Sequence, residues 1–104
     1  MDKVDITQCP VRKGLKLFES KWNARVLYEL IIHNTMRFGE LRKAIPDISN
    51  TMLAATLKQL EEYGLILRKQ FNEIPPHVEY SLTESGLAFK SVFDAVGMWG
   101  EKYA

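Results

Sequence analysis

The chain of 104 residues has the length of one small domain, and its composition (46% hydrophobic, 26% charged) is that of an ordinary globular protein. This composition excludes disorder for the bulk of the chain, and no apolar run approaches the roughly 20 residues of a membrane span. The net charge of +1 excludes a strongly basic nucleic-acid tail but not a local binding face. The polar start at residues 1–5 lacks a secretory signal and the single cysteine suits a reducing compartment, so we expect a soluble cytoplasmic protein.

Three helices are predicted in the first half of the chain. Pro10 opens the first, because proline is favoured in the first helical turn, where its missing N–H has no partner to lose. Ser20 is a suitable N-cap for the second helix, whose apolar residues recur at helical spacing. The third helix is short, spans residues 38–45 and stops at Pro46, since the residue before a proline disfavours the helical conformation.

The fourth predicted helix has the clearest limits in the sequence. It spans residues 49–63, with Ser49 as its N-cap and Gly64 as a left-handed C-terminal stop. Leu53, Leu57 and Leu60 form its buried stripe. This helix is therefore expected to pack firmly against the preceding ones.

The hydrophobic period then changes from helical to alternating. Residues 65–71 and 77–82 predict two strands of a hairpin, joined by a five-residue tip at residues 72–76. Thr83 caps a final helix that runs nearly to the end of the chain. The predicted order is thus four helices, a hairpin and one more helix.

Three helices followed by a two-stranded hairpin form a winged helix-turn-helix, so we expect a mainly α fold with a small β-hairpin. A single domain, residues 1–104, would place the helix-turn-helix and the wing in residues 36–82. The segments 1–19 and 83–104 would supply helices for dimerisation.

The helix at residues 49–63 is the candidate recognition helix, because the second helix of a helix-turn-helix enters the major groove of DNA. Its first turn offers free N–H groups to a phosphate, and its small residues allow close approach to bases. The residues predicted to contact DNA from this helix are Ser49, Asn50, Thr51, Ala54, Ala55 and Lys58. Cations around it would neutralise phosphates, namely Arg37, Arg42, Lys43, Arg68 and Lys69. The alternative is a solvated surface helix that binds nothing.

The hairpin tip is a second candidate DNA contact. Pro75 and Pro76 remove two N–H donors and are expected to preset the tip in an extended form. A rigid tip could reach a neighbouring minor groove or phosphate backbone, with His77 beside it in the DNA-contacting set. The alternative is an ordinary hairpin turn.

The final helix carries apolar residues over a wider arc than a small domain can cover. They are Phe89, Val92, Phe93, Val96, Trp99 and Tyr103, with further small and apolar residues beyond them. A thick contact with the core of its own domain is one explanation. We favour a dimer interface, because a terminal aromatic helix would otherwise leave an exposed apolar patch.

No motif in the sequence points to an enzyme. It has no glycine-rich phosphate loop, no CxxC and no His/Glu pair at metal-binding spacing, so neither a cofactor nor a metal is expected. Cys9 is the one reactive candidate. At the N-cap before Pro10, helix N–H groups and the nearby Arg12 and Lys13 would favour its thiolate, as in a redox or electrophile sensor. The alternative is a small buried hydrophobic residue.

Several short motifs are spread along the chain from Cys9 to Trp99. They are Cys9-Pro10-Val11, Lys21-Trp22, Arg37-Phe38-Gly39-Glu40-Leu41, Ile48-Ser49, Leu60-Glu61, Gly64-Leu65-Ile66 and Pro75-Pro76-His77-Val78-Glu79-Tyr80-Ser81-Leu82-Thr83. Together they resemble the HxlR-type helix-turn-helix family, small bacterial transcription regulators related in fold to the MarR group. The segment that ends at Thr83 is the most specific part of the resemblance.

This resemblance implies a homodimer that binds a pseudo-palindromic operator in double-stranded DNA. The first and last helices would form the dimer, so that Val11, Leu15 and Phe18 join the final helix in the interface. Cys9 would correspond to a thiol that senses quinones, aldehydes or oxidants as effectors. The alternative function is a winged helix that contacts a partner protein instead of DNA, because the net charge is low and the face around Ala54 is featureless. A thiol-dependent enzyme is a third hypothesis, with no base near Cys9 to support it.

Overall fold

The structure is a computed structural model and describes residues 9–104. In chain order its elements are α1 (Pro10–Leu15), the 3-10 helix η1 (Lys16–Glu19), α2 (Lys21–His33), β1 (Thr35–Arg37), α3 (Phe38–Ala44), α4 (Asn50–Glu62), β2 (Ile66–Phe71), β3 (His77–Leu82), α5 (Glu84–Leu87) and α6 (Lys90–Tyr103). The expectation about residues 1–5, and the first part of the predicted dimerisation segment 1–19, lie outside the described residues. None of the helices in residues 9–104 is both long and apolar enough to cross a membrane.

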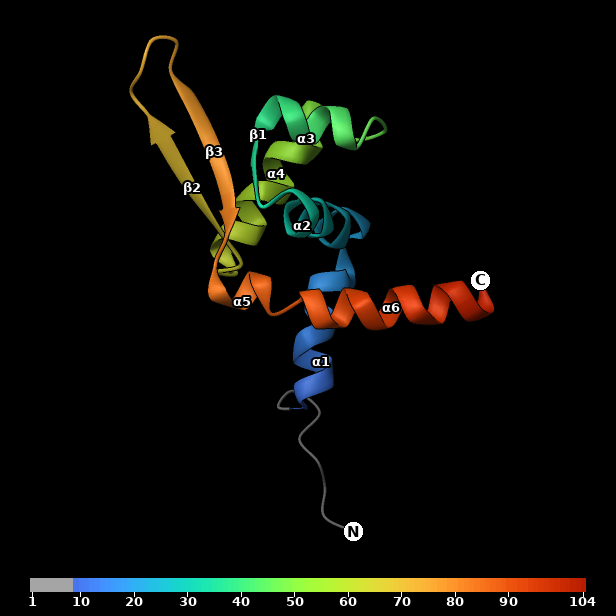
Figure 1. Cartoon of the computed structure of the whole chain (residues 1–104). Helices are drawn as coiled ribbons and strands as arrows, with labels where there is room; N and C mark the ends of the chain where they lie inside the picture. Colours follow the sequence, from blue (N-terminus) through green and yellow to red (C-terminus); the bar gives the residue numbers. More distant parts are fainter. Residues whose placement is uncertain (1–8) are drawn as a thin grey trace.

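The core lies where α2 packs against α3 and α4 (Figure 1). Helical spacing brings the predicted leucines of α4 to one side, and all three are buried. They pack against the buried apolar residues of α2, and apolar residues of the turn between α3 and α4 complete the core. The fully buried apolar side chains are Val26, Leu27, Leu30, Leu41, Ile45, Ile48, Leu53, Leu57, Leu60 and Ile66. The predicted helix-turn-helix is therefore confirmed as the centre of the fold.

The helix ends follow from local side-chain chemistry. Ser20 accepts a hydrogen bond from the Trp22 N–H (3.3 Å), and Ser49 accepts one from the Met52 N–H (3.0 Å). Gly64 has a φ of +75°, the left-handed conformation that stops α4. These three predicted helix limits are confirmed.

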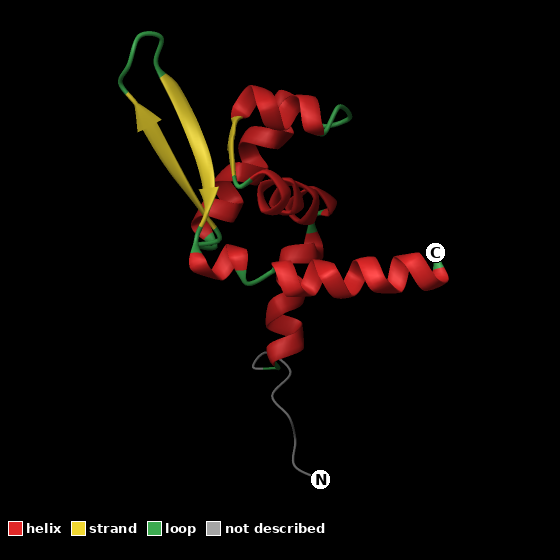
Figure 2. Ribbon diagram, in the orientation of Figure 1, coloured by secondary structure: helices red, strands yellow, loops and turns green. Residues whose placement is uncertain are grey.

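The wing is a three-stranded antiparallel sheet with the order β1-β3-β2 (Figure 2). The hairpin of β2 and β3 was predicted and is confirmed, and its register pairs Arg68 with Tyr80. Strand β1 was not predicted. It pairs Met36 with the other side of Tyr80, which anchors the base of the wing to the segment between α2 and α3.

Two predicted elements need correction. The first helix tightens after Leu15 into η1, and the final helix is interrupted at residues 88–89, between α5 and α6. The second break follows from packing on both sides of it. Gly86 lies so close to the Leu65 carbonyl that α5 is fixed against the base of the wing, whereas Phe89 and Phe93 are packed against the core cluster.

The hairpin tip also differs from the prediction. Residues 73–75 bend rather than continue in an extended form, and the Ile74–Pro75 peptide bond is cis. The hairpin nevertheless projects beyond α3 and α4 as a free arm (Figure 1).

Candidate nucleic-acid interface

Helix α4 presents a small and mostly uncharged face to solvent. Thr51, Ala54, Ala55 and Lys58 are exposed, as the helical period of the sequence predicts. Ser49 and Asn50 are exposed at the N-terminus of α4, where the helix dipole and the free N–H groups favour an anion. The small side chains of Thr51, Ala54 and Ala55 allow the α4 backbone to approach another surface closely.

The turn between α3 and α4 is fixed by two arginines. The Arg42 guanidinium donates to the Ile48 carbonyl, which ties α3 to the turn. Arg25 on α2 makes two hydrogen bonds to Asp47, of 2.9 and 3.1 Å. These hydrogen bonds from Arg25 hold the pKa of Asp47 below its ordinary value and raise the pKa of Arg25. The orientation of α4 relative to α2 is thus set partly by charge.

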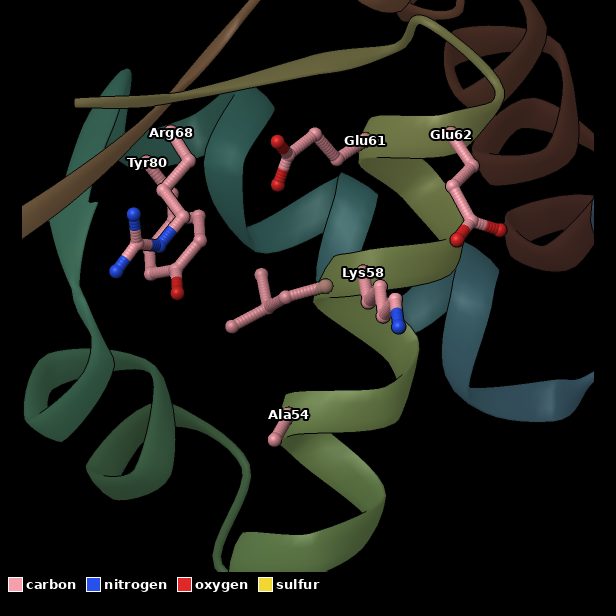
Figure 3. A pocket seen from close by; sticks show the side chains of 7 residues that line it. Ala54, Lys58, Glu61, Glu62, Arg68 and Tyr80 are labelled. Atoms are coloured by element: carbon pink, nitrogen blue, oxygen red, sulfur yellow. The ribbon is translucent and has the colours of Figure 1, made fainter.

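A groove of about 470 Å³ separates α4 from the wing (Figure 3). Ala54 and Lys58 lie on its α4 side, and Arg68 and Tyr80 lie on its wing side. Arg68 and Tyr80 are cross-strand partners, so their side chains share one face of the sheet. The groove joins the exposed face of α4 to the wing in one continuous surface. Glu61 and Glu62 mark its end near the C-terminus of α4.

Strand alternation separates the two predicted cations of the wing. Arg68 faces α4, whereas Lys69 lies on the opposite face, with its ammonium 4.9 Å from the centre of the Phe71 ring. Among the described residues neither makes an ion pair, and the same holds for Lys58. All three positive charges are therefore available for an anionic partner.

The remaining predicted contacts lie at the edges of this surface. Arg37 and Lys43, at the two ends of α3, are exposed. His77 is different, because its side chain is only 14% exposed, stacks on Phe71 with the ring centres 4.7 Å apart, and bonds to Glu79 at 2.9 Å. His77 therefore braces the tip of the wing from within.

A second exposed surface is apolar and lies on the far side of the molecule from the wing. Helix α6 has no buried residue and extends away from the core as an arm, in a direction different from that of α1 (Figure 1). Phe89 and Phe93 pack partly inward, against Phe18 and Tyr28. The others of the predicted interface remain exposed, namely Val11, Leu15, Val92, Val96, Trp99 and Tyr103. Phe18 itself is at the margin, 39% exposed, with its ring steeply inclined to that of Phe89.

Cys9 is half-buried and forms the N-cap of α1, as the sequence predicts. Its side chain makes no capping hydrogen bond, so the sulfur is not committed to holding the helix end. No three residues of the His, Cys, Asp and Glu types come together as metal ligands within residues 9–104.

Three features of this surface were not predicted from the sequence. Met52 is exposed on the first turn of α4, Tyr80 lines the groove, and Ile74 stands fully exposed at the tip of the wing. The hairpin register would have placed Tyr80 beside Arg68. Ile74 lies within the predicted five-residue tip, and a tip position is itself the signal for an exposed side chain.

The fold and this surface define a winged helix-turn-helix protein, and comparison with known proteins specifies the family. Residues 17–104 match the model of the HxlR-like helix-turn-helix family. The chain is 43% identical to YdzF of Bacillus subtilis strain 168, an HTH-type transcriptional regulator, over 89% of this chain and 85% of YdzF. The chain belongs to the HxlR-like helix-turn-helix family and is a transcriptional regulator of the DNA-binding helix-turn-helix type, a class without enzymatic activity.

Solved structures agree with this assignment. A MarR-family transcriptional regulator of Porphyromonas gingivalis W83 superposes with a TM-score of 0.88, at 39% identity, over 99% of this chain and 100% of the other. The redox regulator HypR in its oxidised form gives a TM-score of 0.81 at 35% identity, over 92% of this chain and 98% of HypR. The resemblance inferred from the sequence motifs and the winged-helix fold are both confirmed.

Proposed function

We propose that this protein binds a pseudo-palindromic operator in double-stranded DNA as a homodimer, with α4 of each protomer in the major groove. The observation that carries the proposal is the continuous surface formed by the small exposed face of α4, the groove and the inner face of the wing, which contributes Arg68. A helix of this kind enters the major groove with its N-terminal residues toward the base edges. The wing then lies over the adjacent backbone.

The residues of this surface fall into two classes, those that face the bases and those that contact phosphates. The residues that face the bases are Asn50, Thr51, Ala54 and Ala55. The methyl groups of the two alanines suit contact with a thymine methyl. The residues that contact phosphates, or position α4 on them, are Ser49, Arg37, Arg42, Lys43, Lys58, Arg68 and Lys69. His77 takes a supporting role, because its ring is covered by Phe71 and bonded to Glu79.

Fluorescence-anisotropy titration of a selected duplex tests this division. Lys58→Ala and Arg37→Ala weaken binding to all sequences alike, and each lowers the slope of log affinity against log salt by about one for every phosphate that it no longer neutralises. Substitution of Thr51 or Ala55 changes which duplex is preferred. Lys90→Ala is the matched control, because Lys90 lies on α6 and pairs with Asp94 at 3.1 Å. Unchanged titrations for all four variants, at Arg37, Thr51, Ala55 and Lys58, would refute the assigned DNA face.

The dimer rests on the exposed apolar surface of α1 and α6. Trp99 is 61% exposed and Val96 is 55% exposed, on a helix with no buried residue. Burial of such side chains in a second copy of the arm is favourable, and a patch this large is unusual on a monomer. A two-fold dimer would place the two α4 helices about 34 Å apart, one turn of DNA.

Sedimentation equilibrium tests the dimer. Trp99→Asp shifts the protein to monomers and weakens operator binding, because each half-site is then held by one protomer only. Leu67→Asp, which changes an exposed apolar residue on the wing, leaves the dimer intact. A wild-type protein that sediments as a monomer at micromolar concentration would contradict the proposal.

Control of DNA binding by Cys9 is the regulatory part of the proposal. Cys9 is the only thiol of the chain and forms the N-cap of α1, in the region proposed to dimerise. A relative of similar structure is named a redox regulator. Modification of Cys9 by an oxidant or a quinone-type electrophile would thus act on the dimer and, through it, on the spacing of the two α4 helices. Diamide or a quinone should reduce operator binding by the wild-type protein and leave Cys9→Ser unaffected. Equal loss in both would exclude Cys9 as the sensor.

A further inference from the structure

The tip of the wing carries a large apolar side chain with no contact to the rest of the protein. Ile74 is 100% exposed, the highest value among the large hydrophobic residues of residues 9–104. Its neighbours in the tip, Asn72, Glu73, Pro75 and Pro76, provide no positive charge. The tip is therefore unsuited to bind phosphates by charge. Apolar side chains that contact DNA from the minor groove act instead by inserting between base pairs.

The hairpin holds this side chain on a stiff support. The last cross-strand pair before the tip is Phe71 with His77, and their rings stack at 4.7 Å with an angle of 12° between the planes. The His77 ring lies between two carboxylates, 2.9 Å from Glu79 and 3.9 Å from Glu73. Pro75 and Pro76 restrict the tip further. The backbone that carries Ile74 is thus restrained, so little backbone entropy is lost when the side chain is bound.

The position of the tip identifies its partner. The hairpin projects on the same side of the molecule as α3 and α4 (Figure 1), and its inner face lines a groove with α4. Strand β1 supports β3 only as far as Glu79, so the tip reaches roughly 10 Å beyond the last supported residue, at about 3.3 Å per residue. With α4 in a major groove, this reach carries Ile74 over the backbone to the adjacent minor groove. Lys69, on the outer face of the wing at the base of the tip, then lies near a flanking phosphate.

We propose that Ile74, with Pro75 beside it, is an apolar wedge that enters the minor groove next to each operator half-site and partly unstacks a base step. Proteins that deform DNA from the minor groove insert Ile, Leu, Phe, Met or Pro between base pairs in this way. Pyrimidine–purine steps such as TA unstack most easily, so the wedge selects flexible flanking sequence without a hydrogen bond to any base. Ile74 is thereby a specificity-determining residue at positions that α4 does not reach. This inference rests on the proposed operator binding.

The test uses the full-length protein and a duplex selected from a random-sequence library. 2-Aminopurine replaces, one at a time, the adenines of the minor-groove flanks, because its fluorescence rises when it is unstacked. At saturating wild-type protein, fluorescence should rise at one step on each flank. Ile74→Ser should abolish this rise while α4 still binds the half-sites. Leu67→Ser is the matched control, since Leu67 is also an exposed apolar residue of the wing, 57% exposed, but lies at its base.

Affinity supplies a second readout. Loss of the buried isoleucine surface should weaken binding about tenfold for a duplex with TA at the flank. For a duplex with a stiff G·C flank, wild type and Ile74→Ser should bind alike. Equal fluorescence and equal affinity for wild type and Ile74→Ser would overturn the wedge and leave operator binding intact. A wild-type protein that retains no duplex would overturn both, and would point to a protein partner for the tip.

Discussion

Replacement of Gly86 by alanine should destabilise the protein more than any other glycine-to-alanine change in the described chain. A Cβ atom on Gly86 would lie 2.1 Å from the Leu65 carbonyl oxygen and 3.1 Å from Leu82 Cδ2. The Leu65 carbonyl is backbone and already accepts the Thr83 N–H at 3.0 Å, so it cannot move without disturbing the start of α5. We expect a loss of about 3 kcal/mol in the free energy of unfolding, the upper part of the range for overpacked sites.

Chemical and thermal denaturation, both followed by circular dichroism, measure this effect. For a domain of about 100 residues, a loss of about 3 kcal/mol lowers Tm by roughly 10–20 °C. Gly39→Ala is the matched control, because a Cβ there meets no atom within 4 Å and the residue lies in α3. That change should raise stability by up to about 1 kcal/mol, since glycine is a poor helix former. All proteins are compared at one concentration, because dimerisation contributes to stability. A Gly86→Ala variant as stable as wild type would refute the packing argument.

Three further predictions concern a buried amide, a helix cap and an exposed ion pair. Asn23→Leu should raise the free energy of unfolding by about 1 kcal/mol, because Asn23 is 1% exposed and its side-chain amide has no hydrogen-bond partner among residues 9–104. Equal denaturation midpoints for wild type and Asn23→Leu would argue against this. Thr83→Ala should lower stability by about 1 kcal/mol in the same assay, since Thr83 caps α5 through the Gly86 N–H; no loss would mean that the cap is dispensable. The hydrogen bonds from Arg25 lower the pKa of Asp47 in the folded protein, so the unfolded chain takes up the proton at a higher pH than the folded protein does. The ion pair therefore stabilises the fold above pH about 4. This stabilisation should fade as pH falls through the pKa of Asp47 in the folded protein. Asp47→Asn should thus be less stable than wild type at pH 6, and the difference should narrow steadily as pH falls below about 4; a difference that stays constant would contradict the ion pair's role.

The features that were predictable from the sequence depend on local chemistry. The limits of α4 follow from the Ser49 cap and the Gly64 stop, and its exposed face follows from the position of its leucines. The hairpin follows from the change of period after Gly64, where alternation is imperfect, and from the clean alternation of residues 77–82 beyond a proline-containing tip. The family follows from the combination of short motifs, and the comparisons confirm it.

The features that were missed depend on contacts between distant segments. Strand β1 has three residues and exists because it pairs with β3, more than 40 residues later in the chain. The break between α5 and α6 reflects the approach of Gly86 to Leu65. The ion pair of Arg25 with Asp47 spans 22 residues, and no periodicity reports it. The bend at the tip likewise needs the three-dimensional path of the hairpin.

The most direct test of the central claim is to sequence the genomic fragments that the purified protein retains, with and without a mild thiol oxidant. The proposed function predicts one enriched motif of two inverted half-sites, with centres about 34 Å apart, for the reduced protein. Its recovery should fall on oxidation for wild type and persist for Cys9→Ser. If recovery of the motif does not change with the oxidant, the operator-binding dimer is supported and Cys9 is excluded as the sensor. No enriched fragment under either condition would contradict operator binding by α4 and the wing.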